Sequence, residues 1–230
     1  EGQVEALQGV DTLILVSSSE VGQRTLQHNN VIESAKKAGV KHIIYTSLLG
    51  ATTDNTVKSL AGAHVETEAA LKASGITYTI LRNGWYTENY TASIPAALAN
   101  NAFYGSAKNG KISSVLRAEL AEAAVNVALS EGHENQTYEL AGSTSWTLAD
   151  LAAEISKQTG KGIPYVDIPA ADYAAALVQA GLNEGFAGLI AQWDVDASNG
   201  ALFSEDKTLD KLLGRPTAGL DVAVKQALDH

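Results

Sequence analysis

Small polar side chains follow three strands that this sequence predicts, and together they could bind a polar ligand. They are Ser17, Ser18, Ser19, Thr46, Ser47, Asn83 and Gly84, and the aromatic residues Trp85 and Tyr86 follow directly. Hydroxyl and amide groups suit the hydroxyls of a sugar, and large rings suit a flat ring. In open parallel sheets, ligands bind outside the carboxyl ends of the strands. The pattern therefore predicts a binding site at one edge of a sheet.

Two alternatives stay open for these residues. Serine and threonine routinely end strands and cap helices without binding anything. The rings in Arg82–Tyr90 ("RNGWYTENY") could instead hold a C-terminal lobe against the sheet.

Acid and base groups are sparse along the chain. His64 and Glu68 are four residues apart on a predicted helix, so they share a face, and a histidine there could deliver a proton near neutral pH. The alternative is a surface histidine beside a carboxylate that pairs along the helix. Tyr104 and Lys108 have the spacing of a ketone-reducing pair, but Gly105 between them predicts a loop, and we reject this pair. The candidate catalytic residues are therefore His64, Asn83 and Tyr86.

Strands and helices alternate in the first part of the chain. Strands are predicted near residues 11–17, 41–47, 77–82 and 137–141, and helices over 25–38, 57–73, 91–100 and 117–130. In the first helix, Leu26, Val31, Ile32 and Ala35 are expected on the buried side, and Gly39 ends it. Nearly continuous apolar strands between helices predict an α/β fold with a doubly wound parallel sheet.

The second part of the chain is predicted to be mostly helical. A loop is expected over 104–113, and Thr147 with Asp150 predicts the capped start of a helix that Gly160 ends. We divide the chain into a dinucleotide-binding core, residues 1–142, and a small C-terminal lobe on the substrate side, residues 143–230.

A phosphate-binding turn is absent from the sequence, which has no G-x-G-x-x-G motif. Such a turn normally follows the first strand of this kind of sheet. We therefore expect that N-terminal strands are missing from the chain as given.

Composition narrows the function. The chain has 230 residues, 45% of them apolar, no cysteine and a formal net charge of −10. Clustered basic residues would be expected for nucleic-acid binding, so we expect no nucleic-acid partner. There is no disulfide framework, no signal peptide, no membrane-length apolar run and no metal-ligand spacing among the histidines, so we expect a cytoplasmic protein without metal.

Four segments carry a resemblance to a known family. They are "LILVSSSEVGQR", "HNNVIESAKKAGVKHIIYTSLL", "HVETEAALKASGITYTILRNGWYTENY" and "YELAGSTSWTLADLAAEISKQTGK". Together they resemble the NmrA-like atypical short-chain dehydrogenases, and the likeness covers essentially all of the chain. It implies a Rossmann-like core, a small lobe, NADPH between them and hydride transfer to a quinone or a similar conjugated acceptor. The alternative that it leaves open is a dinucleotide-sensing regulator without turnover.

The resemblance also implies roles for the candidate residues. Ser17, Ser18 and Ser19 would line the ribose region, Thr46 and Ser47 the floor of the nicotinamide site, and Asn83, Gly84, Trp85 and Tyr86 the ring pocket. His64 stands where isoflavone-reductase-like relatives have a catalytic lysine. Hydride addition to a quinone leaves a phenolate-like oxygen whose conjugate acid titrates around 10, so water or one histidine can protonate it. A small-molecule partner is expected, and a homo-oligomer is left open.

Overall fold

A parallel sheet of four strands forms the first half of the molecule. The computed structural model describes residues 2–20 and 22–229. The strand order is β1 (Thr12–Leu15), β2 (His42–Leu48), β3 (Thr77–Asn83) and β5 (Gln136–Leu140), and every neighbouring pair is parallel. All four predicted strands are confirmed to within two residues at either end.

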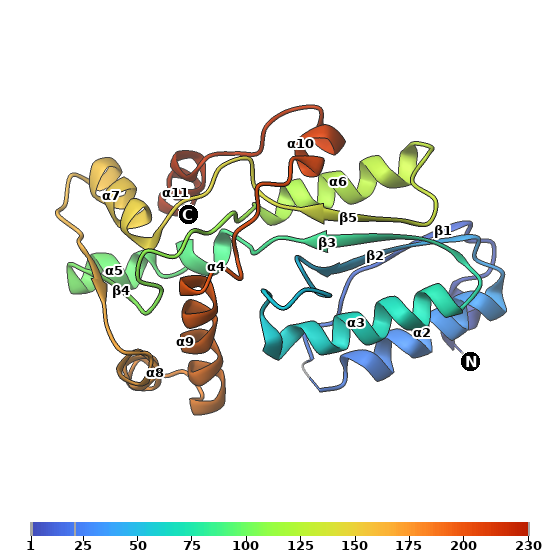
Figure 1. Ribbon diagram of the computed structural model, residues 1–230, viewed down its shortest axis with the longest axis horizontal. Coiled ribbons are helices and arrows are strands. Elements are labelled where there is room, and N and C mark those ends of the chain that lie inside the picture. The colour runs from blue at the N-terminus through green and yellow to red at the C-terminus, as the bar shows by residue number, and fades with distance from the viewer. Residues whose placement is uncertain (1, 21, 230) are drawn as a thin grey trace.

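Helices cover both faces of this sheet (Figure 1). On one face lie α2 (Arg24–Ala38) and α3 (Lys58–Ala73), and α1 (Gly2–Ala6) contacts α2. On the other face lie α6 (Arg117–Leu129) and α10 (Thr208–Leu213), which contact each other. The doubly wound parallel α/β fold is therefore confirmed, with helices from both halves of the chain on the sheet.

Alternation along β2 separates the two cores. Ile43 and Tyr45 are fully buried against α2 and α3, where Ile32 and Ala35 are also buried. Ile44 points to the opposite face, toward Leu120 of α6. Successive side chains of a strand point to opposite faces, so this pattern fixes the direction of every later residue of β2.

Helix α2 ends as predicted but does not bury all of the expected side. Gly39 follows it with φ of 82°, a left-handed conformation that favours glycine, and its N–H caps Ala35 and Lys36. Leu26, predicted on the buried side, is 59% exposed. That part of the prediction is wrong, because the polar residues Arg24 and His28 take the buried positions at this end of the helix.

A smaller lobe is built around a second sheet. β4 (Phe103–Gly105) pairs in parallel with β6 (Tyr165–Asp167). Around them lie α4 (Glu88–Thr91), α5 (Ile94–Asn100), α7 (Leu148–Thr159), α8 (Ala170–Gln179), α9 (Glu184–Ser198) and α11 (Leu220–Leu228) (Figure 1). The helix predicted over 91–100 is thus two short helices, and the loop predicted over 104–113 begins within β4.

The predicted division at residue 142 stays a prediction, and segments cross it in both directions. β4 lies before it and pairs with β6 after it, whereas α10 lies after it and packs on α6 and β5. The capping box of α7 is confirmed, since Thr147 and Asp150 each accept from the other's backbone N–H, and Gly160 ends the helix with φ of 70°. Among the helices within residues 2–20 and 22–229, none is long and apolar enough to cross a membrane.

Candidate functional site

The carboxyl ends of β1 and β2 are joined by Ser17 and Thr46. The Ser17 backbone N–H donates to Thr46 Oγ1 at 2.8 Å, and the Thr46 hydroxyl donates to Ser17 Oγ at 3.3 Å. Thr46 is buried and Ser17 is half-buried. The structure therefore brings together two of the residues that the sequence placed at this edge.

Asn83, the last residue of β3, points to the same face of the sheet as Thr46. Its register partner is Leu48, two residues after Thr46 on β2. The side chain is only 6% exposed, yet its Oδ1 finds no hydrogen-bond partner in the part of the chain that the structure describes. Buried acceptors are usually paired, so an unpaired one at a strand end suits a ligand that carries an N–H donor.

Ser47 lies on the other face of the sheet and does not join Thr46. Its hydroxyl donates to Glu68 Oε1 at 2.6 Å, and Arg82 donates to both carboxylate oxygens of Glu68, at 2.9 Å and 2.7 Å. Arg82 also pairs with Glu139 at 2.9 Å. The prediction that Thr46 and Ser47 together form the floor of the nicotinamide site is thus corrected, because neighbouring residues of a strand face opposite sides of the sheet.

The buried ion pair determines the charge of both partners. Burial works against ionisation of Glu68, but hydrogen bonds from Arg82 and Ser47 hold its pKa below the usual range. The hydrogen bond with Glu68 raises the pKa of Arg82. This network joins α3 to β2 and β3, so the Ser47 hydroxyl has a structural partner and is not free to bind a ligand.

Residues 17–19, which follow β1 and are called the serine loop below, are held mainly through the backbone. The Ser18 N–H donates to His28 Nε2 at 2.9 Å, and Arg24 Nε donates to the Ser18 carbonyl at 2.6 Å. The Ser18 hydroxyl accepts from the Glu20 N–H at 3.2 Å, and Ser19 is exposed. Among the described residues, the hydroxyl groups of Ser18 and Ser19 donate no hydrogen bond, so both can donate to a ligand.

His64 is buried rather than on the surface. It is 4% exposed, its Nε2 lies 3.2 Å from Arg24 Nη1, and its Nδ1 lies 2.8 Å from Tyr45 Oη. A guanidinium only donates, so Nε2 accepts and Nδ1 carries the proton toward the tyrosine. Burial, with the nearby charge of Arg24, lowers the pKa of His64 to about 3.

Two expectations about His64 are corrected by this geometry. Its imidazole is neutral near neutral pH, so it is not the protonated donor that the sequence suggested. It is also not a surface histidine paired with Glu68, because Glu68 pairs with Arg82. His64 instead fixes Arg24, which in turn fixes the Ser18 carbonyl.

Arg24 and His28 are the residues of this site that sequence reasoning missed. They are four residues apart on α2, and both are buried. His28 accepts from Ser18 at Nε2, so its Nδ1 donates to Thr67 Oγ1 at 3.0 Å. Burial, with Arg24, lowers the pKa of His28 to about 4. Two polar residues at helical spacing on a side of α2 that faces the sheet were the available signal.

Gly84 and Trp85 pack rather than line an open pocket. A Cβ on Gly84 would lie 2.6 Å from the Leu140 carbonyl oxygen, so glycine lets β3 pass close to β5. Trp85 is 8% exposed and packs edge-on against Trp193 of α9, with ring centroids 5.3 Å apart. Tyr86 is half-buried, with the guanidinium of Arg117 4.7 Å from its ring centroid.

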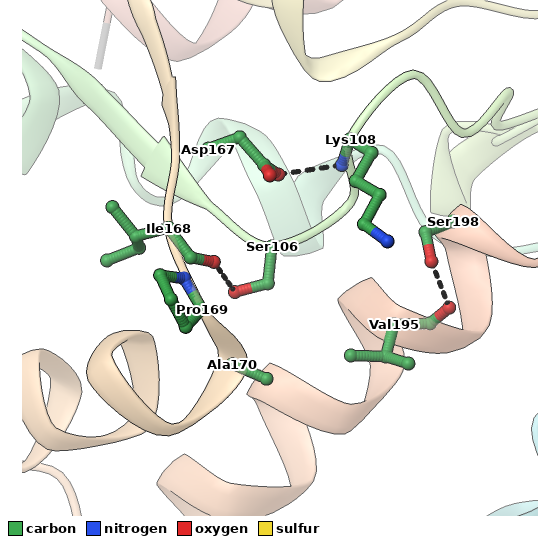
Figure 2. Close-up of a pocket in the computed structure, with 8 residues that line it drawn as sticks. All are labelled: Ser106, Lys108, Asp167, Ile168, Pro169, Ala170, Val195 and Ser198. Atoms are coloured by element: carbon green, nitrogen blue, oxygen red, sulfur yellow. Dashed lines mark hydrogen bonds between the residues drawn. The ribbon is translucent and has the colours of Figure 1, made fainter.

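A separate pocket lies in the lobe, where the chain leaves β4 and β6 (Figure 2). It has a volume of about 380 Å³, and its lining is Ser106, Lys108, Asp167, Ile168, Pro169, Ala170, Val195 and Ser198. Its polar groups are largely paired with one another: Lys108 N–H donates to Asp167 and the Ser106 hydroxyl to the Ile168 carbonyl. None of the candidate residues at the sheet edge lines it. In the described residues, no cluster of metal-ligating side chains is found.

Comparison with known proteins gives consistent similarities. A family model described as NAD(P)H-binding matches residues 3–131. Quinone oxidoreductase 2 of Escherichia coli (strain K12) is 56% identical over 219 residues, which cover 95% of this chain and 76% of that protein. The NmrA-like family domain-containing oxidoreductase flvB of Aspergillus flavus is 30% identical over 247 residues, covering 97% of this chain and 75% of that protein.

A solved structure is similar over nearly the whole chain. It is the NADPH-dependent quinone oxidoreductase QOR2 of Escherichia coli in complex with NADPH. The superposition has a TM-score of 0.94 at 54% identity, and it covers 98% of this chain and 79% of that one.

Proposed function

This chain belongs to the NAD(P)H-binding family and has NmrA-like relatives, and from this premise we propose that it is an oxidoreductase that transfers hydride from NADPH to a quinone or a similar conjugated ring. The observation that carries the proposal is the unpaired, buried Oδ1 of Asn83, on the same face of the sheet edge as Thr46. The similarity to an NADPH-dependent quinone oxidoreductase supports the choice of cofactor and acceptor.

The residues of this edge fit the cofactor. A buried acceptor such as Asn83 Oδ1 suits an amide N–H, and the hydroxyls of Ser18 and Ser19 suit those of a ribose. Bound NADPH supplies the hydride. Thr46 fixes the start of the serine loop through Ser17, so the edge is shaped before a ligand arrives.

His64 has a positioning role in this proposal. Through Arg24 it holds the Ser18 carbonyl, while His28 holds the Ser18 N–H, so two neutral imidazoles fix the serine loop from α2 and α3. Water then protonates the reduced acceptor, because a phenolate-like oxygen whose conjugate acid has a pKa of about 10 is protonated readily by a weak acid. Asn83 and Tyr86 stay the proposed contacts of the reacting rings.

The test is steady-state oxidation of NADPH by para-benzoquinone with the protein expressed from its complete gene. We expect a rate that is proportional to protein concentration and well above the uncatalysed rate. If NADPH and NADP⁺ bind equally well while no quinone is reduced, the protein is a dinucleotide-sensing regulator and the proposal is wrong.

We further propose a cytoplasmic enzyme that acts on a small molecule and has no nucleic-acid partner. The absence of cysteine and the net charge of −10 support this. Assembly into a homo-oligomer stays open, and light scattering of the purified protein determines it.

A further inference from the structure

A row of three aromatic rings leads from the sheet edge onto α9. Trp85 follows β3 by two residues, and its ring centroid lies 5.3 Å from that of Trp193. The Trp193 centroid lies 6.0 Å from that of Phe186, and both contacts are edge-to-face. Phe186 and Trp193 are seven residues apart on α9, which is two helical turns, so they lie on one face of the helix.

Trp193 also ties α9 to the helix that carries His64. Its Nε1 donates to Ser59 Oγ at 3.1 Å, and Ser59 lies in the first turn of α3, five residues before His64. Just past the C-terminal end of α9, the Gly200 carbonyl accepts from Asn55 Nδ2 at 3.0 Å. Two segments that follow β2 therefore hold α9 beside the carboxyl end of the sheet (Figure 1).

Exposure decreases along this row toward the sheet. Phe186 is 50% exposed, Trp193 is half-buried, and Trp85 is 8% exposed. Packing of α9 on the core accounts for the burial of Trp85 and Trp193, but it leaves Phe186 half-exposed. Trp193 and Phe186 therefore extend the aromatic row outward from Trp85, which is itself already covered.

We propose that Trp193 and Phe186 form the contact surface for the outer part of a flat, multi-ring acceptor, and that they determine how strongly the protein prefers such acceptors over single-ring ones. This proposal rests on the proposed function, since the acceptor is the compound reduced there. Aromatic pairs contribute beyond their buried area, so each lost ring contact weakens binding severalfold. The occupant is a small molecule with two or more fused conjugated rings.

The test measures binding rather than turnover. Dissociation constants for naphthoquinone and para-benzoquinone are measured by quenching of tryptophan fluorescence in the presence of NADP⁺, which cannot donate hydride. We expect Phe186→Ala to weaken naphthoquinone binding about fivefold and para-benzoquinone binding less than about twofold. Affinity for NADP⁺ should stay unchanged, and thermal stability should fall only slightly, because Phe186 is half-exposed and loses a single ring contact, with Trp193.

Three further variants separate binding from packing. Trp193→Phe keeps a ring on Trp85 but loses the hydrogen bond to Ser59, and Ser59→Ala loses that bond alone. We expect Trp193→Phe to weaken naphthoquinone binding more than Ser59→Ala does. Tyr104→Ala removes another exposed ring, 42% exposed and on β4, and should leave both dissociation constants unchanged.

The outcomes distinguish this inference from the proposed function. If the protein reduces quinones while Phe186→Ala and Trp193→Phe bind naphthoquinone as tightly as the wild type, the inference is overturned and the function stands. If naphthoquinone binds and Phe186→Ala weakens it, but NADPH is never oxidised, the ring surface is supported and the function fails. If naphthoquinone does not bind at all, the inference is overturned.

Discussion

Arg24 and His64 come from different helices and meet through a hydrogen bond of 3.2 Å between Nη1 of the arginine and Nε2 of the histidine. Because the guanidinium can only donate, this contact fixes the tautomer of His64, whose Nδ1–H then donates to Tyr45. The same arginine donates to the Ser18 carbonyl. The position of the serine loop therefore depends on a neutral imidazole that lies 40 residues after Arg24 in the chain.

Two replacements of His64 should distinguish the contribution of its hydrogen bonds to the free energy of unfolding from the contribution of its packing. His64→Leu leaves Nη1 of the buried Arg24 guanidinium without its acceptor, although Nε keeps the Ser18 carbonyl, so we expect the free energy of unfolding to fall by about 2 kcal/mol. His64→Gln offers one acceptor and one donor, so the loss should be under about 1 kcal/mol. Urea denaturation followed by circular dichroism measures both. Equal losses for the two variants would show that the bond to Arg24 has no net stabilising effect.

The two buried histidines should make stability decrease in acid. Their pKa values, about 3 for His64 and about 4 for His28, lie below 6.5, so between these values the unfolded chain binds protons that the folded chain does not. Stability is therefore lost as pH falls below about 6.5, by up to about 1.4 kcal/mol per pH unit for each histidine.

For His64, the groups that affect this titration are Arg24, His28 and Glu68. Urea denaturation at several pH values should show a shallower loss of stability in His64→Gln than in the wild type. Imidazole resonances of both histidines that titrate near pH 6.5 in the folded protein would contradict the prediction.

The serine loop is expected to bind the cofactor through its side chains. The double change Ser18→Ala with Ser19→Ala should weaken NADPH binding by roughly 1 kcal/mol per lost neutral bond, with little effect on the melting temperature of the free protein. Ser47→Ala is the matched control, since its hydroxyl donates to Glu68. It should lower the melting temperature and leave NADPH affinity alone. Calorimetric titration measures the affinities, and the reverse pattern would make the loop structural.

The buried pair of Glu68 and Arg82 should be sensitive to loss of one partner. In Glu68→Gln the arginine keeps Glu139 but loses a charged acceptor inside the protein, so we expect a loss of about 3 kcal/mol. Asp11→Asn is the control, because the pair of Asp11 and Lys41 is exposed and should contribute little. A stability of Glu68→Gln within error of the wild type, by urea denaturation, would rule out this role.

The sequence predicts the sheet well because its signals are local. Apolar runs of strand length, a glycine after α2 and the Thr147–Asp150 capping box depend on neighbours within a few residues, and the structure confirms each. Strand β4 was missed because three residues with a glycine carry little strand signal. Its partner, β6, is about sixty residues away.

The candidate site was predicted only in part. The opposite faces of Thr46 and Ser47 follow from strand alternation and could have been read from the sequence. The partners of His64 and Arg24 could not, because they come from other parts of the chain. Likewise, Trp193 meets Ser59 across 134 positions of sequence, a contact that no local pattern indicates.

The unpaired Oδ1 of Asn83 gives the sharpest test of whether this sheet edge is the site of hydride transfer. Asn29 is the matched control, since its Oδ1 is also buried without a partner in the described part of the chain, but it lies on α2 rather than on a strand. The measurement is the rate of NADPH oxidation by para-benzoquinone for Asn83→Ala and Asn29→Ala. We predict that Asn83→Ala loses at least about tenfold in kcat/KM, while Asn29→Ala keeps the wild-type value. An Asn83→Ala protein as active as the wild type would contradict the assignment of this sheet edge as the site of hydride transfer.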